Sequence, residues 1–337
     1  MSLQAGETLH GGDYQVLRSL NQGRVGISYL AQRKGGDRVV IKTLRDDVLA
    51  QLTLDKRDKL NNKLLKEAVR LARCHHPHIV RCFDSFLERG QPFIVMEFVA
   101  GDDLASLPTK TLPEEEALTY IRQVGEALTV VHREGWVHRD IKPANIMLRA
   151  GKFEAVLIDF GVTKGFDETL TSIDSSNTDG FSPPELYDPN EQAKPYSDVY
   201  GLAATLYNLL SGDVPPNAQK RVNLQRKDQK LPDIPGVSAE TNWAIRQGME
   251  LDYGDRPQTI EEFLALLPVP QGVKPLPPQP PRDPNFRLNL YMLFVAILAI
   301  FVTIIVTIFG QDIRQSIINW FSSPGVEDNS EPSSPNN

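Results

Sequence analysis

The spacing of apolar positions changes along the chain and divides it into regions of different structure. Residues 14–20 and 38–42 have the pattern of strands, with glycine-containing turns between them. Residues 48–73 have the pattern of a helix. After residue 101 the helical pattern dominates. The sequence therefore predicts a small strand-rich part followed by a larger helical part.

Start signals for individual elements support this division. Pro113 lies in the predicted first turn of a helix, and the glutamates that follow it lie at the positive end of that helix. Residues 146–148 and 155–158 are predicted to be short strands that flank a turn. Thr259 followed by Glu262 is a capping box that opens a last helix. The apolar face predicted for the first of these helices consists of Leu118, Ile121, Val124, Leu128 and Val131.

Beyond residue 267 the composition changes twice. Residues 268–287 are rich in proline, which cannot occupy a helix interior and favours extended conformation, so they are predicted to be a semi-rigid linker. Residues 288–310 contain no charged residue and exceed the roughly 20 residues that a helix needs to cross a bilayer. We expect a transmembrane helix here, because core helices of this length are rarely apolar all round. Residues 311–337 are predicted to be a short polar tail.

Composition narrows the classes of partner and compartment. The 337 residues carry a formal net charge of −7, which argues against nucleic acid as a partner because phosphate backbones select basic surfaces. The two cysteines, Cys74 and Cys82, form no disulfide framework and fit a reducing compartment. Histidines near them invite a zinc interpretation, but the spacing fits no usual zinc pattern. Residues 1–12 lack the features of a signal peptide.

The run 138–145, His-Arg-Asp-Ile-Lys-Pro-Ala-Asn, has the residue types that phosphoryl transfer requires. Asp140 can accept the proton of an incoming hydroxyl group. Asn145, five residues later, can hold a metal ion. Lys142 between them can offset negative charge on a phosphoryl group. This combination makes the run the strongest candidate for a catalytic site.

Residues 14–267 resemble the eukaryotic-type (Hanks-type) protein kinase domain and are most similar to membrane-anchored bacterial Ser/Thr kinases. The resemblance implies an α+β, two-lobed protein kinase fold, with a small β-rich N-lobe and a larger helical C-lobe, followed here by the C-terminal transmembrane helix. The family motifs occur in order as the glycine-rich segment 21–28, Val39-Val40-Ile41-Lys42, His76-Pro77, Met96-Glu97-Phe98-Val99, the run 138–145, Asp159-Phe160-Gly161, Pro183-Pro184-Glu185 and Asp255-Arg256-Pro257.

The resemblance implies that ATP binds between the lobes, with the backbone of Glu97 and Val99 holding the adenine. Three residues depart from the family pattern: Asn21 replaces the first loop glycine, Ser28 a valine and Val40 an alanine. We expect these departures to affect nucleotide affinity more than chemistry, and Asn21 to preserve the turn because asparagine tolerates positive φ. The implied nucleotide-binding residues are Asn21, Gly23, Gly26, Ser28, Val40, Lys42, Glu97, Val99 and Met147.

The resemblance also assigns catalytic roles. Lys42 is implied to hold the ATP phosphates and to pair with Glu67. Asp140 is implied to orient the acceptor hydroxyl, with Lys142 beside it. The implied ligands of Mg²⁺ or Mn²⁺ are Asn145 and Asp159.

Two further residues are implied to have structural roles. Glu185 should form a buried ion pair with Arg256. This pair would anchor the activation segment, the stretch between the Asp159-Phe160-Gly161 and Pro183-Pro184-Glu185 motifs. Asp198, at the start of a helix, should hold the backbone of the catalytic run.

These residues together predict an ATP-dependent Ser/Thr protein kinase, because Lys142 is typical of kinases with Ser/Thr acceptors. Its partners would be protein substrates, ATP and the lipid bilayer. We expect autophosphorylation at Thr171 or Ser172, with the phosphate paired to Arg139, and a homodimer would allow this reaction in trans. The alternative is a pseudokinase that acts as a membrane-bound scaffold.

The charges around the apolar span predict its orientation. Lys274, Arg282 and Arg287 precede it, whereas Arg314 is the one basic residue that follows it. Since positive residues mark the inner side, we expect a single-pass protein of the cell membrane with its kinase domain in the cytoplasm. The alternative is a hairpin or peripheral association that leaves both ends inside.

Overall fold

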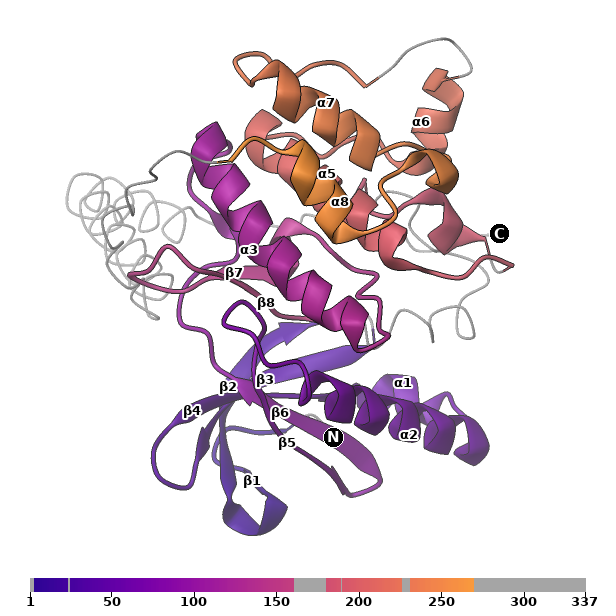
Figure 1. Cartoon of the computed structure of the whole chain (residues 1–337). Helices are drawn as coiled ribbons and strands as arrows, with labels where there is room; N and C mark the ends of the chain where they lie inside the picture. Colours follow the sequence, from indigo (N-terminus) through magenta and orange to yellow (C-terminus); the bar gives the residue numbers. More distant parts are fainter. Residues whose placement is uncertain (1–2, 24, 161–179, 189, 226–230, 270–337) are drawn as a thin grey trace, which may run out of the picture. The chain divides into compact units, whose positions relative to one another are not determined.

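A 6-stranded antiparallel sheet forms the first part of the computed structural model, which describes residues 3–23, 25–160, 180–188, 190–225 and 231–269 (Figure 1). The strand order is β1-β2-β3-β4-β6-β5. Its strands are β1 (Thr8–Leu9), β2 (Tyr14–Gln22), β3 (Gly26–Arg33), β4 (Arg38–Leu44), β5 (Cys82–Glu88) and β6 (Gln91–Glu97). Both strands predicted in this part are present, and each extends two residues further than the pattern indicated.

Alternation of side chains explains why the sheet forms. Successive side chains of a strand point to opposite faces, so residues two apart share a face. One face of the sheet carries a cluster of buried apolar residues at this spacing, and water is excluded from it. Its members are Leu9, Tyr14, Val16, Ile27, Tyr29, Ala31, Val39, Ile41, Phe93 and Val95.

The single helix predicted over residues 48–73 is wrong, because two helices occupy this region. They are α1 (Asp46–Ala50) and α2 (Leu54–Leu71). Between them Leu52 is buried and Thr53 adopts extended backbone dihedral angles, φ −64° and ψ 156°. The chain therefore leaves the helical conformation where Leu52 enters the core, and α2 begins after Thr53.

Helix α2 packs against the sheet through a stripe of apolar residues. Its buried members Leu60, Leu64, Ala68 and Leu71 recur at spacings of three and four, the period of one helix face. The helix contacts strands β5 and β6. This packing fixes the helix that carries Glu67.

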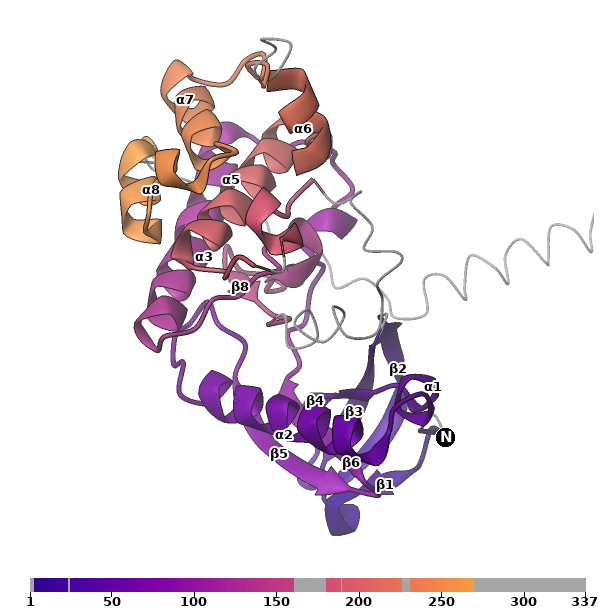
Figure 2. The same ribbon diagram turned by 90° about the vertical axis from the view of Figure 1, so that its right-hand side faces the viewer.

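The second lobe is helical and is built around α3 and α5 (Figure 2). All five residues of the apolar face predicted for α3 are buried, which confirms that prediction. Pro113 adopts extended ψ (144°) and lies just before the first turn rather than within it. The helices of this lobe are α3 (Glu114–Arg133), α5 (Pro195–Ser211), α6 (Ala218–Gln225), α7 (Ala239–Gly248) and α8 (Ile260–Leu266).

A two-stranded hairpin, β7 (Ile146–Leu148) with β8 (Ala155–Leu157), lies between the sheet and the helices in Figure 1. Both strands were predicted. The segment 76–80, which leads to β5, contacts this hairpin because the amide of Val80 donates to the carbonyl oxygen of Leu157 at 3.0 Å. The hairpin thereby connects the two lobes beside the site described below.

One half of the capping box predicted at α8 is present as expected, and the other half involves a neighbouring amide. The hydroxyl of Thr259 accepts from the amide of Glu262 at 3.1 Å, as expected. The carboxylate of Glu262 accepts from the amide of Gln258 at 2.6 Å, one residue before the cap. Both interactions satisfy amides at the helix start, so the stabilising effect is retained.

Single-turn 3-10 helices complete the described fold at the junctions between elements. Among the residues with described structure, no helix is both long and apolar enough to cross a membrane. The predicted linker and transmembrane helix lie almost entirely outside these residues. The 3-10 helices are η1 (His10–Gly12), η2 (Leu104–Ser106), η3 (Pro143–Asn145), η4 (Pro184–Tyr187) and η5 (Tyr253–Asp255).

Candidate active site

The run 138–145 places two side chains, Lys142 and Asn145, at the carboxylate of Asp140. The ammonium group of Lys142 lies 3.1 Å from Oδ2 of Asp140. The amide nitrogen of Asn145 donates to the same Oδ2 atom at 2.8 Å and to the Asp140 carbonyl oxygen at 2.7 Å. Both partners are hydrogen-bond donors, which is the environment that suits a carboxylate acting as a proton acceptor.

The backbone of this run is supported from below by Asp198, at the start of α5. The carboxylate accepts from the amides of His138 and Arg139, each at 2.8 Å, as predicted. Nε2 of His132 lies 2.8 Å from the same carboxylate. Burial opposes the charge on Asp198, but the hydrogen bonds from His132 and His138 outweigh it and hold its pKa below the ordinary value.

Arg139 adopts a backbone conformation that L-residues rarely visit, with φ +68°. The two hydrogen bonds to Asp198 offset this strain. This conformation lies directly before Asp140 in the chain. The backbone that positions Asp140 therefore depends on a buried residue that is distant in the sequence, Asp198.

Lys42, on β4, forms its ion pair with Asp159 and not with Glu67. Asp159 follows β8 in the other lobe, so this contact joins the two lobes across the site. The Lys42–Glu67 pair implied by the family resemblance is not formed between these two described residues. The structure thus brings the lysine to the expected metal ligand while Glu67 lies apart from it.

Glu67 is mostly buried on α2, and its Oε2 atom has no hydrogen-bond partner within the described part of the chain. Burial raises its pKa to about 7, although the cationic groups of Lys63, Arg139 and Arg70 partly oppose the shift. The carboxyl group therefore titrates near neutral pH. A close contact with a cationic side chain would favour the ionised form of Glu67.

The aromatic side chain that follows Asp159 packs beneath the catalytic run. Phe160 is buried, with its ring centroid 4.7 Å from that of His138 and 5.1 Å from that of Trp136. This packing ties the position of Asp159 to the position of Asp140. Gly161, the last residue of the motif, lies outside the described residues.

The glycine-rich segment 21–28 forms the tip of the β2–β3 hairpin. The amide of Gly23 donates to the carbonyl oxygen of Gly26 at 2.9 Å, which closes the tip. A Cβ atom added at Gly26 would lie 3.2 Å from the carbonyl oxygen of Thr43, so the site favours glycine. Asn21 pairs with Ser28 within the strands and does not have positive φ. The hairpin thus forms with Asn21 present, as expected, but Asn21 has ordinary strand geometry and its tolerance of positive φ is not used.

The segment 96–99, which corresponds to the hinge between the lobes in the kinase family, lies near the remaining predicted nucleotide residues. Glu97 ends β6, and Val99, two residues later, is buried. Val40 pairs with Met96 across β4 and β6. Met147, on β7, forms a bridge with Asp103 beyond the hinge. The predicted residues thus come from the sheet, the hinge and the β7–β8 hairpin.

The available oxygen atoms fit a hard divalent cation. Asn145 uses its amide nitrogen on Asp140, and its Oδ1 atom accepts no hydrogen bond from the described residues. With the carboxylate of Asp159 it supplies the oxygen donors that Mg²⁺ and Mn²⁺ prefer. The described residues contain no group of three or more His, Cys, Asp or Glu side chains placed to hold a metal. A cation between Asn145 and Asp159 would therefore depend on phosphate and water oxygens as well.

Comparison with known proteins agrees with this arrangement. A family model described as "Protein kinase domain" matches residues 14–266, which is more than half of the chain. The chain belongs to the protein kinase family.

Bacterial Ser/Thr kinases are among its relatives. The chain is 32% identical over 272 residues to "Serine/threonine-protein kinase pkn2" of Myxococcus xanthus, covering 76% of this chain and 32% of the relative. It is 30% identical over 265 residues to "Serine/threonine-protein kinase PknE" of Mycobacterium bovis, covering 75% and 45% respectively. The chain therefore spans less than half the length of these two relatives.

Solved structures give the same fold. A structure titled "PpkA-294 apo form" matches with a TM-score of 0.62 and 27% identity, covering 79% of this chain and 99% of that one. The PknI kinase domain of Mycobacterium tuberculosis matches with a TM-score of 0.60 and 26% identity, covering 79% and 98%. The β-rich N-lobe and helical C-lobe predicted from the sequence are thereby confirmed.

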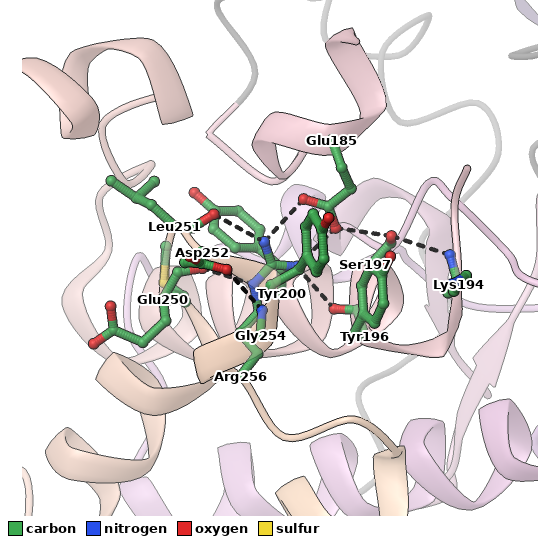
Figure 3. Close-up of polar contacts among 12 residues, drawn as sticks. Glu185, Lys194, Tyr196, Ser197, Tyr200, Glu250, Leu251, Asp252, Gly254 and Arg256 are labelled. Atoms are coloured by element: carbon green, nitrogen blue, oxygen red, sulfur yellow. Dashed lines mark hydrogen bonds and ion pairs between the residues drawn. The ribbon is translucent and has the colours of Figure 1, made fainter. Parts of the chain in front are cut away.

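In this kinase fold, Glu185 and Arg256 form the buried ion pair that was predicted (Figure 3). The guanidinium group donates to both carboxylate oxygens, at 2.7 and 2.8 Å, and both side chains are almost fully buried. Ser197 donates to the same carboxylate at 2.8 Å. The pair fixes η4, which begins at Pro184, a few residues after the segment 161–179 in the sequence.

A cavity of about 580 Å³ lies between α2 and the catalytic run. Its lining includes one basic side chain from the run, Arg139, and several from α2, whereas Glu67 is the one acidic residue of the lining. We call this the cation cavity. Its basic residues are Lys59, Lys63, Lys66, Arg70 and Arg139.

Sequence reasoning missed some of these features. The basic residues of α2 recur at intervals of four, three and four, so their common face was visible as a helical charge stripe. The contact of His132 with Asp198 spans 66 residues and gives no local signal. The ion pair between Arg149 and Glu97 also gives no local signal, because the two residues are 52 positions apart in the sequence.

Proposed function

We propose that this protein is an ATP-dependent Ser/Thr protein kinase that phosphorylates protein hydroxyl groups. The observation that supports this proposal most strongly is the cluster of Lys142 and Asn145 around Asp140, because it provides an anionic proton acceptor beside a cation. Lys42 and Asp159 lie across from it and provide the phosphate and metal contacts. A scaffold without catalysis would not need this cluster.

The roles of the chain's own groups follow from their chemistry. Asp140 accepts the proton of the substrate hydroxyl, and Lys142 offsets charge on the transferring phosphoryl group. Lys42 binds the ATP phosphates, and Asn145 with Asp159 holds the divalent cation. The cation, when bound, neutralises charge on the phosphates. Glu97 and Val99 hold the adenine through their backbone.

The direct test is labelling with radioactive ATP and Mg²⁺ followed by acid hydrolysis and separation of the phosphoamino acids. We expect label on phosphoserine and phosphothreonine, both in the protein itself and in added protein substrates. Label confined to phosphotyrosine would contradict the acceptor class. Absence of transfer with intact nucleotide binding would favour the pseudokinase alternative.

We further propose that a phosphate group on the activation segment occupies the cation cavity. Thr171 and Ser172 are the candidate sites, and both lie outside the described residues. The support is the excess of cations over the single acid Glu67 in the lining, which favours a dianion. Phosphorylation would draw α2 toward the catalytic run, since Lys63 comes from α2 and Arg139 from the run.

Mass spectrometry of the protein before and after incubation with ATP tests the site of autophosphorylation. The cavity is tested by Lys63→Gln, which should lower the activity of the phosphorylated protein by about tenfold, the value of one charge-assisted contact. Lys56→Gln is a matched control, because Lys56 is an exposed cation on α2 outside the cavity. Equal activity of both variants would contradict the proposal. Mixing active and Asp140→Asn copies would show whether the reaction occurs in trans between two molecules.

We also propose that residues 288–310 anchor the kinase in the cell membrane as a single helix, with the kinase domain in the cytoplasm. The support is the uninterrupted apolar composition of this span and the basic residues that precede it. ATP and reduced thiols are cytoplasmic, which agrees with this orientation.

A further inference from the structure

An ion pair joins the hinge strand to the large lobe beside the proposed adenine site. Nη1 of Arg149 donates to Oε1 of Glu97 at 2.5 Å. Glu97 is the last residue of β6 in the small lobe, whereas Arg149 follows β7 in the large lobe. Their side chains are only 19% and 24% exposed, so water screens the contact less than it screens a surface pair.

Arg149 is held in place independently of this contact. Its amide donates to the carbonyl oxygen of Glu154 at 2.9 Å, and its carbonyl oxygen accepts from Lys152 at 3.0 Å, so its backbone closes the β7–β8 hairpin. Its Nε atom lies 3.3 Å from the carboxylate of Glu154. The guanidinium group therefore lies between the carboxylates of Glu154 and Glu97. Its contact with Glu154 and the hairpin backbone orient it independently of Glu97.

The connecting segment between the lobes is held to the same hairpin. The amide of Ala150 donates to the carbonyl oxygen of Ala100 at 2.7 Å, and the amide of Leu148 donates to that of Asp102 at 2.8 Å. Gly101 lies so close that an added Cβ atom would be 1.8 Å from the carbonyl oxygen of Leu148. The segment after Glu97 is thus fixed by its backbone, and Glu97 itself by Arg149.

We infer that Arg149 is a positioning residue for nucleotide binding, which acts through Glu97. This inference rests on the proposed function, in which the backbone of Glu97 and Val99 holds the adenine. The backbone amide of Glu97 donates to the carbonyl oxygen of Arg81 at 2.8 Å on one side. The Arg149 contact restrains its side chain on the other side. Loss of that contact frees the end of β6 to shift and leaves the chemistry at Asp140 untouched.

The test is a comparison of steady-state kinetics with varied ATP and of the binding of ADP with Mg²⁺. Arg149→Gln should raise the KM for ATP and the Kd for ADP about three- to tenfold, with kcat changed less than about twofold. Arg149→Lys should restore part of the affinity. Glu97→Gln should match Arg149→Gln, and the double variant should be no weaker than either single variant, because all three lose the same contact.

Lys152→Gln is the control, since Lys152 lies on the same hairpin and, among the described residues, its ammonium group pairs with Glu154 alone, at 3.6 Å. It should leave both constants unchanged. Unchanged constants in Arg149→Gln, an effect on kcat alone, or additive effects in the double variant would overturn the inference. A wild-type protein that fails to bind ADP or ATP would instead refute the proposed function, and this inference with it.

Discussion

Lys42 and Glu67 illustrate how the protonation of one residue depends on its neighbours. Lys42 forms its ion pair with Asp159, so Glu67 is left with a buried oxygen that has no hydrogen-bond partner among the described residues, and burial raises its pKa to about 7. Buried carboxyl groups without a close cation favour the neutral form. The charges that face Glu67 are Lys63 and Arg70 on its own helix, Arg139 on the catalytic run and Lys42 on β4.

This situation predicts a pH dependence of stability for the nucleotide-free protein. Between pH 4.5 and 7 the folded state binds the Glu67 proton more tightly than the unfolded state, so Glu67 makes stability fall as pH rises through this range. Glu67→Gln removes the titration. Its melting temperature should therefore rise relative to the wild type on going from pH 5 to pH 8, by an amount equivalent to at most about 3 kcal/mol. A constant difference across this range would contradict the burial of an uncompensated carboxyl group.

The elements around the site are fixed by a few buried polar contacts. The Glu185–Arg256 pair binds η4 to the segment before α8, and Arg256 also donates to the carbonyl oxygen of Glu250 at 2.6 Å (Figure 3). Removal of one partner leaves a buried charge without compensation, which is far more costly than loss of an exposed pair.

Glu185→Gln should consequently destabilise the protein by about 3–5 kcal/mol, which corresponds to a decrease in melting temperature of roughly 6–15 °C. Arg133→Gln is the matched control. Arg133 forms an exposed pair with Glu261 at 3.6 Å, and its loss should change the melting temperature by only about 1–2 °C. Similar decreases in melting temperature in both variants would show that burial does not determine how much the Glu185–Arg256 pair contributes to stability.

At this scale the sequence predicted much of the fold, for identifiable reasons. The buried face of α3 and the strands β2, β4, β7 and β8 followed from local spacing, and Glu185–Arg256 followed from the motif order. The break before α2 was not predictable, because it depends on Leu52 entering a core that only tertiary contacts create. The Arg149–Glu97 pair joins residues that are distant in the sequence. The same is true of the pairing of Lys42 with Asp159 rather than with Glu67.

At the scale of the whole molecule, the proposed function divides the chain between two tasks, catalysis and attachment. The described residues supply the first, and residues 288–310 are proposed to supply the second. The proline-rich linker between them would keep the kinase domain at a distance from the bilayer. Substrates at or near the membrane would then meet the active site more often than distant ones.

The proposed topology predicts the outcome of protease treatment of sealed, right-side-out vesicles that contain the full chain. A tag placed after Asn337 should be lost, while the kinase domain remains intact, because only the tail faces outward. Detergent should make both accessible. A tag that survives until detergent is added would contradict the single-span arrangement and favour the hairpin or peripheral alternative.

The most direct test of the account is the rate of phosphoryl transfer in the wild type and in Asp140→Asn, measured with radiolabelled ATP and Mg²⁺. Asparagine retains the shape of Asp140 but cannot accept the hydroxyl proton. The account predicts label on serine and threonine with the wild type and a rate lower by roughly 10²–10⁴-fold in the variant, with an unchanged melting temperature and Kd for ADP. Transfer at the wild-type rate by purified Asp140→Asn protein would contradict the assignment of this site.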